Sequence, residues 1–497
     1  MNILLINVPS RKGEGGLVLP LGLLYVGDIL ERNEHNTKII DMYTSDFNSL
    51  DKLMEEFKPS IVGFGGISSS YGGTKKLSLY IKEKYPKVIQ IAGGPLASTY
   101  DLLLKNTKVS VVFHGEVDLN LPVFLKKIES EEPFIDIKGI SYLADGQVMR
   151  NPPEILITNI DEIPYPAYHL VDMHIYALPV ETLLNAYDAV LRHNPQLRRD
   201  VLKKIEGKKL RIPILASRGC TNRCFFCYRH VFGHRQHSVK YVIDHIKYLQ
   251  KEYNISGFQF SDELFNRNQE WILEFCDAIE REKLDIFYIV GGARIDKINE
   301  QLLLRLKQTG CVEIGYGQES GSDIILREYR KGVSRQQNKE ITLLTQNLGI
   351  MVTVQLVIGS PSETNETIHD TINFLRECKC YMVSLNYLIP LPETPSWQYV
   401  TEHSLINDVE KYLDDVAEYG GMRMLVNLTN EPDDVVRSWY PRICYETTRN
   451  YYKFTNQTHL YLLYTLFGRT RKYLEPFLPN ETKGKIRSFL RKYHLRG

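Results

Sequence analysis

Short apolar runs alternate with amphipathic helical patterns along most of this chain, and that alternation restricts the possible folds more than any other feature. Over residues 1–130 five pairs occur: 3–8 and 21–32, 38–42 and 50–57, 61–64 and 74–85, 88–92 and 98–104, 109–113 and 119–128. Strands that alternate with helices form parallel sheets with helices on both faces. An α/β, flavodoxin-like (Rossmann-type) domain is therefore predicted for residues 1–130.

Small residues follow three of these strands. The loops are 63–70, 93–95 and 115–116, and their candidate ligand contacts are Ser68, Ser69, Gly93, Gly94, Gly115 and Glu116. Ligands bind such sheets at the carboxyl ends of the strands, where glycine lets a bulky group approach the backbone. A single glycine loop often serves only to turn the chain, but three loops in register favour a ligand site.

A second alternating region covers residues 210–400. Its expected strands are 211–216, 257–261, 286–290, 312–316, 351–358 and 382–388, with helical patterns at 239–253, 269–283, 299–309, 334–348 and 363–376. Six strands with helical patterns between them predict a (β/α)6 partial barrel of the TIM type, in which chemistry gathers on the loops after the strands.

Two further regions lack this alternation. Residues 131–209 are predicted to be a linker, with a hairpin over 139–148 and a charged helical stretch at 181–209. Residues 401–497 are predicted to form a small helical region that is rich in tyrosine and basic after Arg449. The tyrosines fit either a helical core or a pocket for a large apolar or lipid-like substrate. The basic end fits either a solvated surface or peripheral contact with a membrane or an anionic substrate.

Composition restricts the partners. The net charge of the 497 residues is +1, which gives no reason to expect nucleic acid as a partner. The first residues read as a strand and not as a signal peptide, and no apolar run approaches the roughly 18 to 20 residues of a membrane span. A cytoplasmic protein follows, in which a cysteine cluster more often binds metal or takes part in catalysis than forms disulfides.

Three of the eight cysteines, Cys220, Cys224 and Cys227, lie on the loop after the first expected barrel strand. Structural zinc usually takes four protein ligands, and no second cysteine pair follows. A fourth zinc ligand would have to be a nearby histidine: His230, His234 or His237. The spacing CxxxCxxC is better matched to a four-iron cluster held by three cysteines, which leaves one iron open to a ligand.

These cysteines resemble the signature of the radical S-adenosylmethionine (SAM) enzymes. The strings 258–265, 292–296, 315–322 and 358–364 resemble the second to fifth strand-end motifs of that family in order. Upstream, the strings 20–25, 93–95 and 114–116 are similar to the cobalamin-binding domain of one large subgroup, the class B methylase-like enzymes. The resemblance covers residues 1–400 and is specific for the class but not for the substrate.

The resemblance implies cofactors and roles for the matching residues. Cys220, Cys224 and Cys227 would ligate a [4Fe-4S] cluster, whose open iron would hold the amino and carboxylate groups of SAM. The SAM contacts would be Phe226, Asp262, Glu263, Arg294, Glu319, Ser320, Ile358 and Gly359. Cobalamin would lie on the three small-residue loops. Arg294 and Glu319 have an alternative role, in which they pair with one another or with the backbone.

The chain departs from the family pattern in two respects. No Asp-x-His-x-x-Gly string occurs in the first domain, so no histidine of that motif would replace the base of cobalamin; the nearest string starts at Asp172 and lacks the glycine. Ser362 and Glu393 stand where the family has glycine, which puts the shape of two loops in doubt.

The implied activity is methylation of an unactivated carbon in a biosynthetic intermediate through a 5′-deoxyadenosyl radical. The electron donor would be a protein such as flavodoxin or ferredoxin. Cyclisation or rearrangement with the same cofactors is a first alternative, and a non-catalytic protein that binds zinc or cobalamin is a second.

Overall fold

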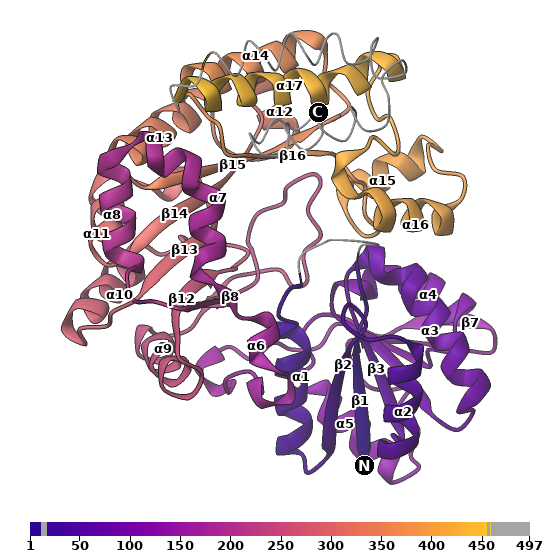
Figure 1. Ribbon diagram of the computed structural model, residues 1–497. Coiled ribbons are helices and arrows are strands. Elements are labelled where there is room, and N and C mark those ends of the chain that lie inside the picture. Colours follow the sequence, from indigo (N-terminus) through magenta and orange to yellow (C-terminus); the bar gives the residue numbers. More distant parts are fainter. Residues whose placement is uncertain (11–16, 455–457, 459–497) are drawn as a thin grey trace, which may run out of the picture.

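The computed structural model describes residues 1–10, 17–454 and 458, and contains two seven-stranded sheets (Figure 1). The first sheet has the order β2-β1-β3-β4-β5-β6-β7. Its parallel strands are β1 (Asn2–Asn7), β2 (Asn36–Asp41), β3 (Ile61–Gly65), β4 (Ile89–Gly93) and β5 (Val111–Phe113). The order 2-1-3-4-5 is the flavodoxin-like order, which confirms the predicted fold of this domain.

Helices cover both faces of the first sheet. The helices are α1 (Leu21–Arg32), α2 (Phe47–Phe57), α3 (Tyr71–Lys84), α4 (Tyr100–Asn106) and α5 (Asn120–Glu129). Alternate strand residues face opposite sides, so Leu5 packs with α1 and α5 while Leu4 packs with α2, α3 and α4. This arrangement leaves the carboxyl ends of the strands free to form a site.

The hairpin predicted inside the linker extends the first sheet. It consists of β6 (Ile140–Ala144) and β7 (Gln147–Arg150), which pair antiparallel with β5 and with each other. Asp145 and Gly146 both have positive φ, at 48° and 75°. A two-residue turn of this kind matches the twist of the strands it joins. The expectation that this segment is only a linker is therefore wrong for residues 140–150.

The second sheet has the order β16-β15-β14-β13-β12-β9-β8. Six strands run parallel: β9 (Leu210–Ile214), β12 (Ile255–Phe260), β13 (Phe287–Ala293), β14 (Cys311–Glu319), β15 (Met351–Ile358) and β16 (Val383–Tyr387). The short strand β8 (Leu178–Pro179) adds antiparallel to β9. The two edges, β8 and β16, do not pair, so the sheet is a curled partial barrel as predicted.

The barrel strands are separated by helices that pack on one face of the sheet. These helices are α9 (Val239–Tyr253), α10 (Gln269–Arg281), α11 (Glu300–Gln308), α12 (Asp323–Glu328), α13 (Arg335–Asn347) and α14 (Asn365–Glu377). The charged stretch of the linker forms α7 (Val180–His193) and α8 (Pro195–Ile205), after the short α6 (Met173–Tyr176). Val180 and Val201 pack against Phe287 and Ile289, whose neighbours Tyr288 and Val290 face α10. Helices α7 and α8 therefore cover the opposite face of the barrel sheet.

The C-terminal region divides between the two domains. It contains α15 (Pro395–Glu402), α16 (Val409–Tyr419) and α17 (Asp433–Phe454). Helix α16 packs on the first domain, where Glu410 accepts hydrogen bonds from Tyr71, Lys75 and Asn106. Helix α17 lies over α14, to which Glu446 is joined by an ion pair with Arg376 of 3.0 Å. The segment from α15 to α17 thus contacts both domains. The sequence pattern did not predict these contacts.

At least two tyrosines of α17 contribute to the core. Tyr452 is 1% exposed, and Tyr440 stacks on Tyr387 of β16 at 5.5 Å between ring centroids. Most of the basic residues after Arg449 lie outside the described residues. Within the described part of the chain, no helix combines the length and the apolar character needed to cross a membrane.

Candidate cofactor site

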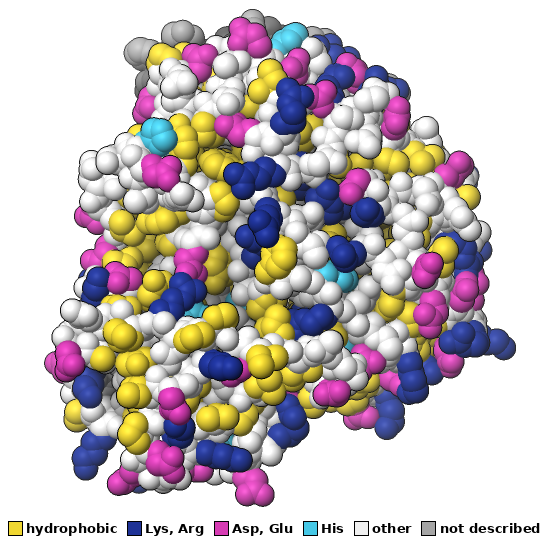
Figure 2. All heavy atoms as spheres, turned by 180° about the vertical axis from the view of Figure 1, so that it is seen from behind, with side chains coloured by type: hydrophobic (Ala, Val, Ile, Leu, Met, Phe, Trp, Pro, Cys, Tyr) yellow, Lys and Arg dark blue, Asp and Glu magenta, His cyan; other side chains and the backbone are white. Residues whose placement is uncertain are grey.

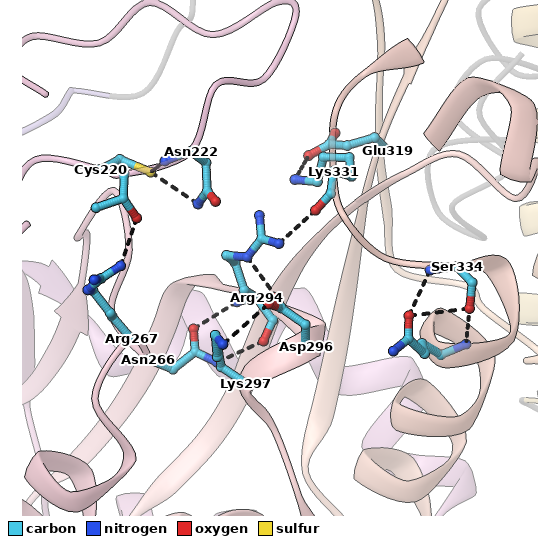
Figure 3. A network of polar contacts seen from close by, with 12 residues as sticks. Cys220, Asn222, Asn266, Arg267, Arg294, Asp296, Lys297, Glu319, Lys331 and Ser334 are labelled. Atoms are coloured by element: carbon cyan, nitrogen blue, oxygen red, sulfur yellow. Dashed lines mark hydrogen bonds and ion pairs between the residues drawn. The ribbon is translucent and has the colours of Figure 1, made fainter. Parts of the chain in front are cut away.

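The three cysteines lie on the loop between β9 and α9, at the carboxyl end of the barrel strands. The short strands β10 (Ser217–Arg218) and β11 (Arg235–Gln236) pair antiparallel at the base of this loop, and Cys220 forms a backbone bridge with Phe232. The amide of Phe225 donates to the carbonyl of Tyr329, 3.2 Å away. The Sγ atom of Cys220 accepts from Asn222 Nδ2 at 3.3 Å (Figure 3). The loop is therefore held by barrel backbone as well as by its own turns.

The thiols of the loop lie in a partly desolvated setting. Burial raises the pKa of Cys224. Desolvation of the sulfur and the negative charges of Cys224, Glu263 and Cys220 raise the pKa of Cys227, although the residue as a whole is exposed. Thiolates that lie this close together need positive charge, which the irons of a cluster supply. Among the described residues, no three His, Cys, Asp or Glu side chains are placed to hold a single metal ion.

The nearby histidines have other contacts. His234 Nε2 lies 3.0 Å from the carbonyl oxygen of Leu264, and His237 Nδ1 lies 3.2 Å from Asp161 Oδ1. His230 lines the cavity between the cysteine loop and the first domain, and no hydrogen-bond partner of its buried Nδ1 is found among the described residues. Three soft sulfur donors without a histidine partner fit a four-iron cluster with one open iron, and they do not favour the zinc alternative.

Asp262 lies under the start of the cysteine loop. It is 4% exposed, and its Oδ1 atom accepts from the amide of Ala216 at 3.0 Å and from the Ser217 hydroxyl. Burial raises its pKa to about 7, and its Oδ2 atom is buried without a partner. The sequence predicted a contact with SAM; the structure places this carboxyl as a support for the loop that carries the cysteines.

Arg294 and Glu319 are joined through a residue that the sequence did not single out. Lys331 donates from Nζ to Glu319 Oε1 at 3.0 Å, and its carbonyl accepts from Arg294 Nη2 at 2.6 Å (Figure 3). Arg294 also pairs with Asp296 at 2.7 Å. Glu319 has a φ of 63°, a left-handed conformation that is costly for this residue and common at functional sites. The expected pairing with backbone thus holds for Arg294, whereas Glu319 pairs with a side chain that the sequence did not point to.

The other expected SAM contacts come from three loops around the barrel mouth. The Phe226 ring meets Tyr329 edge to face at 5.1 Å. Ser320 is buried, with its hydroxyl 3.2 Å from that of Thr371. Ile358 is 1% exposed, and Gly359 follows with a φ of 94°. The contacts of all these residues with SAM stay predictions.

Ser362 and Glu393, which stand where the family has glycine, both form contacts that hold their loops. Ser362 donates from its amide and its hydroxyl to Glu328, at 3.2 and 3.1 Å. Glu393 takes the left-handed conformation, with a φ of 66°, that glycine favours, and it forms an ion pair with Arg150 of β7. Hydrogen bonds to a carboxylate thus support the first loop, and an ion pair supports the second.

A cavity of about 510 Å³ joins the first domain to the cysteine loop. Its walls are mainly apolar, as expected for a cofactor pocket. Its lining includes Gly63, Gly65, Gly66, Ile67, Gly93, Gly94, Gly115 and Glu116 from the strand ends of the first sheet, and Ser217, Gly219, His230, Val231 and Glu263 from the barrel. One cavity therefore touches both candidate cofactor regions.

Of the predicted cobalamin contacts, the two serines do not line this cavity. The Ser68 hydroxyl lies 2.8 Å from that of Ser98, and the Ser69 hydroxyl donates to the carbonyl of Ser10 at 3.0 Å. Gly66 and Ile67, just before them, form the wall instead. His174, from the string that lacks the family's glycine, does not line the cavity either.

Buried ion pairs connect the first domain to the base of the cysteine loop. Arg218 lies 3.0 Å from Asp118 and 3.4 Å from Glu116, and Arg235 forms a two-pronged contact with Glu116. These side chains are at most 14% exposed. Glu116 thus lines the cavity while its carboxylate is paired. Glu263 forms no ion pair with a described residue; desolvation and nearby Glu116 raise its pKa, and nearby Arg229 partly opposes the rise.

A partial barrel with a three-cysteine loop, next to a flavodoxin-like sheet that shares a cavity with it, defines the class of radical SAM enzymes that carry a cobalamin domain. Comparison with family models agrees: the Radical SAM superfamily matches residues 214–375, and the B12 binding domain matches residues 14–124. The chain is a B12-binding radical SAM enzyme, with a [4Fe-4S] cluster, SAM and cobalamin as its cofactors.

Individual proteins are similar over most of the chain. An uncharacterized methyltransferase of Pyrococcus horikoshii, PH0819, is 29% identical over 417 residues, which are 82% of this chain and 84% of the relative. The anaerobic magnesium-protoporphyrin IX monomethyl ester cyclase of Rubrivivax gelatinosus is 24% identical over 407 residues, 79% and 68% of the two chains.

Two solved structures share the fold. The radical SAM methyltransferase TsrM of Kitasatospora setae, with cobalamin and a [4Fe-4S] cluster bound, has a TM-score of 0.62 at 17% identity, covering 81% of this chain and 75% of that one. The cobalamin-dependent SAM radical enzyme OxsB has a TM-score of 0.60 at 17% identity, covering 99% and 71%.

Replacing Asp262 with alanine is expected to weaken cluster assembly. The change leaves the amide of Ala216 and the hydroxyl of Ser217 buried without an acceptor, at about 1–3 kcal/mol each. The start of the cysteine loop should then move, and the iron retained after anaerobic reconstitution should fall at least severalfold. Iron assays and urea unfolding of the variant measure the two effects.

Asp262→Asn is the matched control, because its side-chain oxygen can accept both hydrogen bonds. It also tests the sign of a pH effect. The folded chain keeps a proton on Asp262 up to about pH 7 that the unfolded chain releases near 3.8, so wild-type stability should fall as the pH rises between these values. The stability of Asp262→Asn should lack this part of the pH dependence. If Asp262→Ala and Asp262→Asn lost iron equally, Asp262 would not act by supporting the cysteine loop.

Proposed function

We propose that this enzyme is a methyltransferase that adds a methyl group to an unactivated carbon of a small-molecule or lipid-like biosynthetic intermediate. The observation that carries the proposal is the shared cavity, which is bounded by Gly93 and Gly94 on one side and by the cysteine-loop residues Gly219 and Val231 on the other. In methyl transfer to a carbon radical, the radical and the methyl donor must meet at the same substrate atom.

When bound, the cluster and SAM supply a carbon-centred radical, and cobalamin supplies the methyl group. The contribution of the protein is position and the exclusion of water. The ion pairs of Arg218 and Arg235 with Glu116 keep the loop that holds the cysteines next to the loop that follows β5. The apolar walls of the cavity restrict water around a reactive radical. All eight cysteines are free, which supports the cytoplasmic location expected from the sequence.

The names of the relatives support methyl transfer, but some of them also support cyclisation. Three of them carry methyltransferase or methylase names: PH0819, the cytidylyl-2-hydroxyethylphosphonate methyltransferase of Streptomyces wedmorensis and the hopanoid C-3 methylase of Methylococcus capsulatus. Three others, the one from Rubrivivax gelatinosus among them, are magnesium-protoporphyrin cyclases. Cyclisation without methyl transfer is therefore the second candidate function.

The test needs no knowledge of the substrate. Holoenzyme with reduced cobalamin is incubated with SAM that carries a trideuterated methyl group, and the cobalamin is then extracted for mass spectrometry. A methyltransferase that is remethylated by SAM should place the labelled methyl group on the bound cobalamin.

A chain that only cyclises its substrate should leave the extracted cobalamin without the label. Free cobalamin incubated with the same SAM but no protein gives the background. Label at the background level in a fully loaded holoenzyme would overturn the methyltransferase proposal and favour the cyclase.

A further inference from the structure

The cysteine loop carries three partly or largely exposed residues to which the site chemistry above gives no role. Phe232 is 56% exposed, an unusual value for a phenylalanine. The guanidinium groups of Arg223 and Arg229 lie 5.1 and 5.4 Å from the centre of the Phe232 ring. We call Arg223, Arg229 and Phe232 the arginine patch.

The arginine patch is connected by short backbone paths to the cluster ligands. Arg223 immediately precedes Cys224, and Arg229 is two residues after Cys227. The backbone of Phe232 is bridged to Cys220, and Arg229 Nη1 donates to the carbonyl of Asn222 at 3.1 Å. A molecule on the patch would therefore lie against the loop that holds the cluster.

Neither arginine of the patch forms an ion pair with a described residue, although Arg229 lies near enough to Glu263 to oppose the rise of that carboxyl's pKa. Among the described residues, no Asp or Glu lies within ion-pair distance of Arg223 or Arg229, whereas Arg218, Arg235 and Arg294 all have such partners. Arg267, whose Nη1 donates to the hydroxyl of Thr221 at 2.8 Å, adds a third charge beside the loop. Figure 2 shows basic side chains gathered near the centre of one face of the molecule.

The form of the patch fits a protein better than a small molecule. Small ligands bind in concave pockets, and the patch residues line none of the main cavities of the described chain. An exposed aromatic ring between arginines is typical of the residues that dominate protein interfaces. Positive charge that is not paired with a carboxylate in direct contact favours an acidic protein and speeds its approach.

We propose that the arginine patch is the docking surface for a small acidic electron-transfer protein. The cluster must gain one electron for each cleavage of SAM, and the patch is the charged surface on the loop that ligates it. The reduced flavin or iron–sulfur centre of the carrier loses one electron and the cluster gains it, with no bond made to the partner. Carriers of this kind bind through small, weak interfaces, in which the arginine patch would form the charged centre.

The test compares two reductants on holoenzyme. The cluster of wild type and of the double variant Arg223→Gln, Arg229→Gln is reduced by flavodoxin hydroquinone or by dithionite, and its absorbance is followed by stopped flow. The variant is expected to lower the second-order rate constant with flavodoxin about tenfold or more and to flatten its salt dependence. The rate with dithionite, which needs no docking surface, should not change.

A matched control removes two arginines at a distance from the loop. Arg198 and Arg281 are exposed on α8 and at the end of α10, and Arg198→Gln, Arg281→Gln should leave both rates at the wild-type value. Phe232→Ala should weaken flavodoxin binding, measured by fluorescence anisotropy, without changing the dithionite rate.

Two results would overturn the proposal. The first is a flavodoxin rate that is the same in wild type and the patch variant; a higher KM for substrate in that variant would then assign the patch to an anionic substrate. The second is an equal loss of rate with both reductants, which would mean that the patch only keeps the loop folded. Since the assay follows the cluster and not the product, its failure is distinct from failure of the methyltransferase proposal.

Discussion

Replacement of Cys224 by alanine is expected to give a folded chain that cannot hold its iron–sulfur cluster. Two sulfurs on a short loop cannot retain a cluster that three sulfurs leave open at one iron. After anaerobic reconstitution, wild type should contain about four irons per chain and the variant only background iron. Iron and sulfide assays, with the absorption spectrum, measure the difference.

Cys444→Ala is the matched control for this experiment. Cys444 is a free, partly buried cysteine on α17, far along the chain from the loop, and its loss should leave the iron content unchanged. Equal iron in wild type and Cys224→Ala would show that the loop does not ligate the cluster. Stoichiometric zinc in wild type in place of iron would reject the radical mechanism.

The strands of both sheets were predictable because each is a short apolar run between helical patterns. In the barrel, β15 occupies the predicted residues 351–358, and the other five strands lie within a few residues of prediction. The role of the hairpin formed by β6 and β7 was not predictable, because its sequence shows a turn but not the strand with which it pairs. The docking of α16 on the first domain is likewise a contact between residues more than three hundred positions apart.

The candidate site was predictable where its residues are adjacent in sequence. The cysteines are recognisable by their spacing, and the loops with Gly93 and Gly115 by their composition. Lys331 gives no such signal, because it becomes a site residue only when the chain returns to bring it beside Glu319. The support role of Asp262 is hidden for the same reason, since its hydrogen-bond donors are 45 and 46 residues away.

The hydroxyls of Ser68 and Ser69 show a further limit of sequence patterns. A loop rich in serine and glycine looks suited to hydrogen-bond a ligand, but these side chains satisfy groups of the protein itself. Buried polar atoms need partners, and in a crowded loop the nearest partner is often another loop. The cavity wall therefore comes from the backbone of the glycines beside them.

Replacement of Gly93 by phenylalanine is expected to prevent cobalamin binding while leaving the cluster intact. Gly93 has an extended backbone, with φ of −164°, so any residue can take its conformation. A Cβ atom added there meets no atom closer than the Cβ of Phe113, at 3.6 Å, which is ordinary contact. The aromatic ring would then extend into the cavity of about 510 Å³ and fill part of the space that cobalamin needs.

Cobalamin retained after gel filtration and iron per chain should be measured on the same sample. Wild type should keep close to one cobalamin and a full cluster, and Gly93→Phe should lose the cobalamin and keep the iron. Gly93→Ala, which adds only the methyl group, should behave as wild type. If Gly93→Phe retained cobalamin, the shared cavity would not be the cobalamin site. If the variant lost iron as well as cobalamin, the two domains would depend on each other for folding. The ion pairs of Arg218 with Glu116 and Asp118 would allow such a dependence.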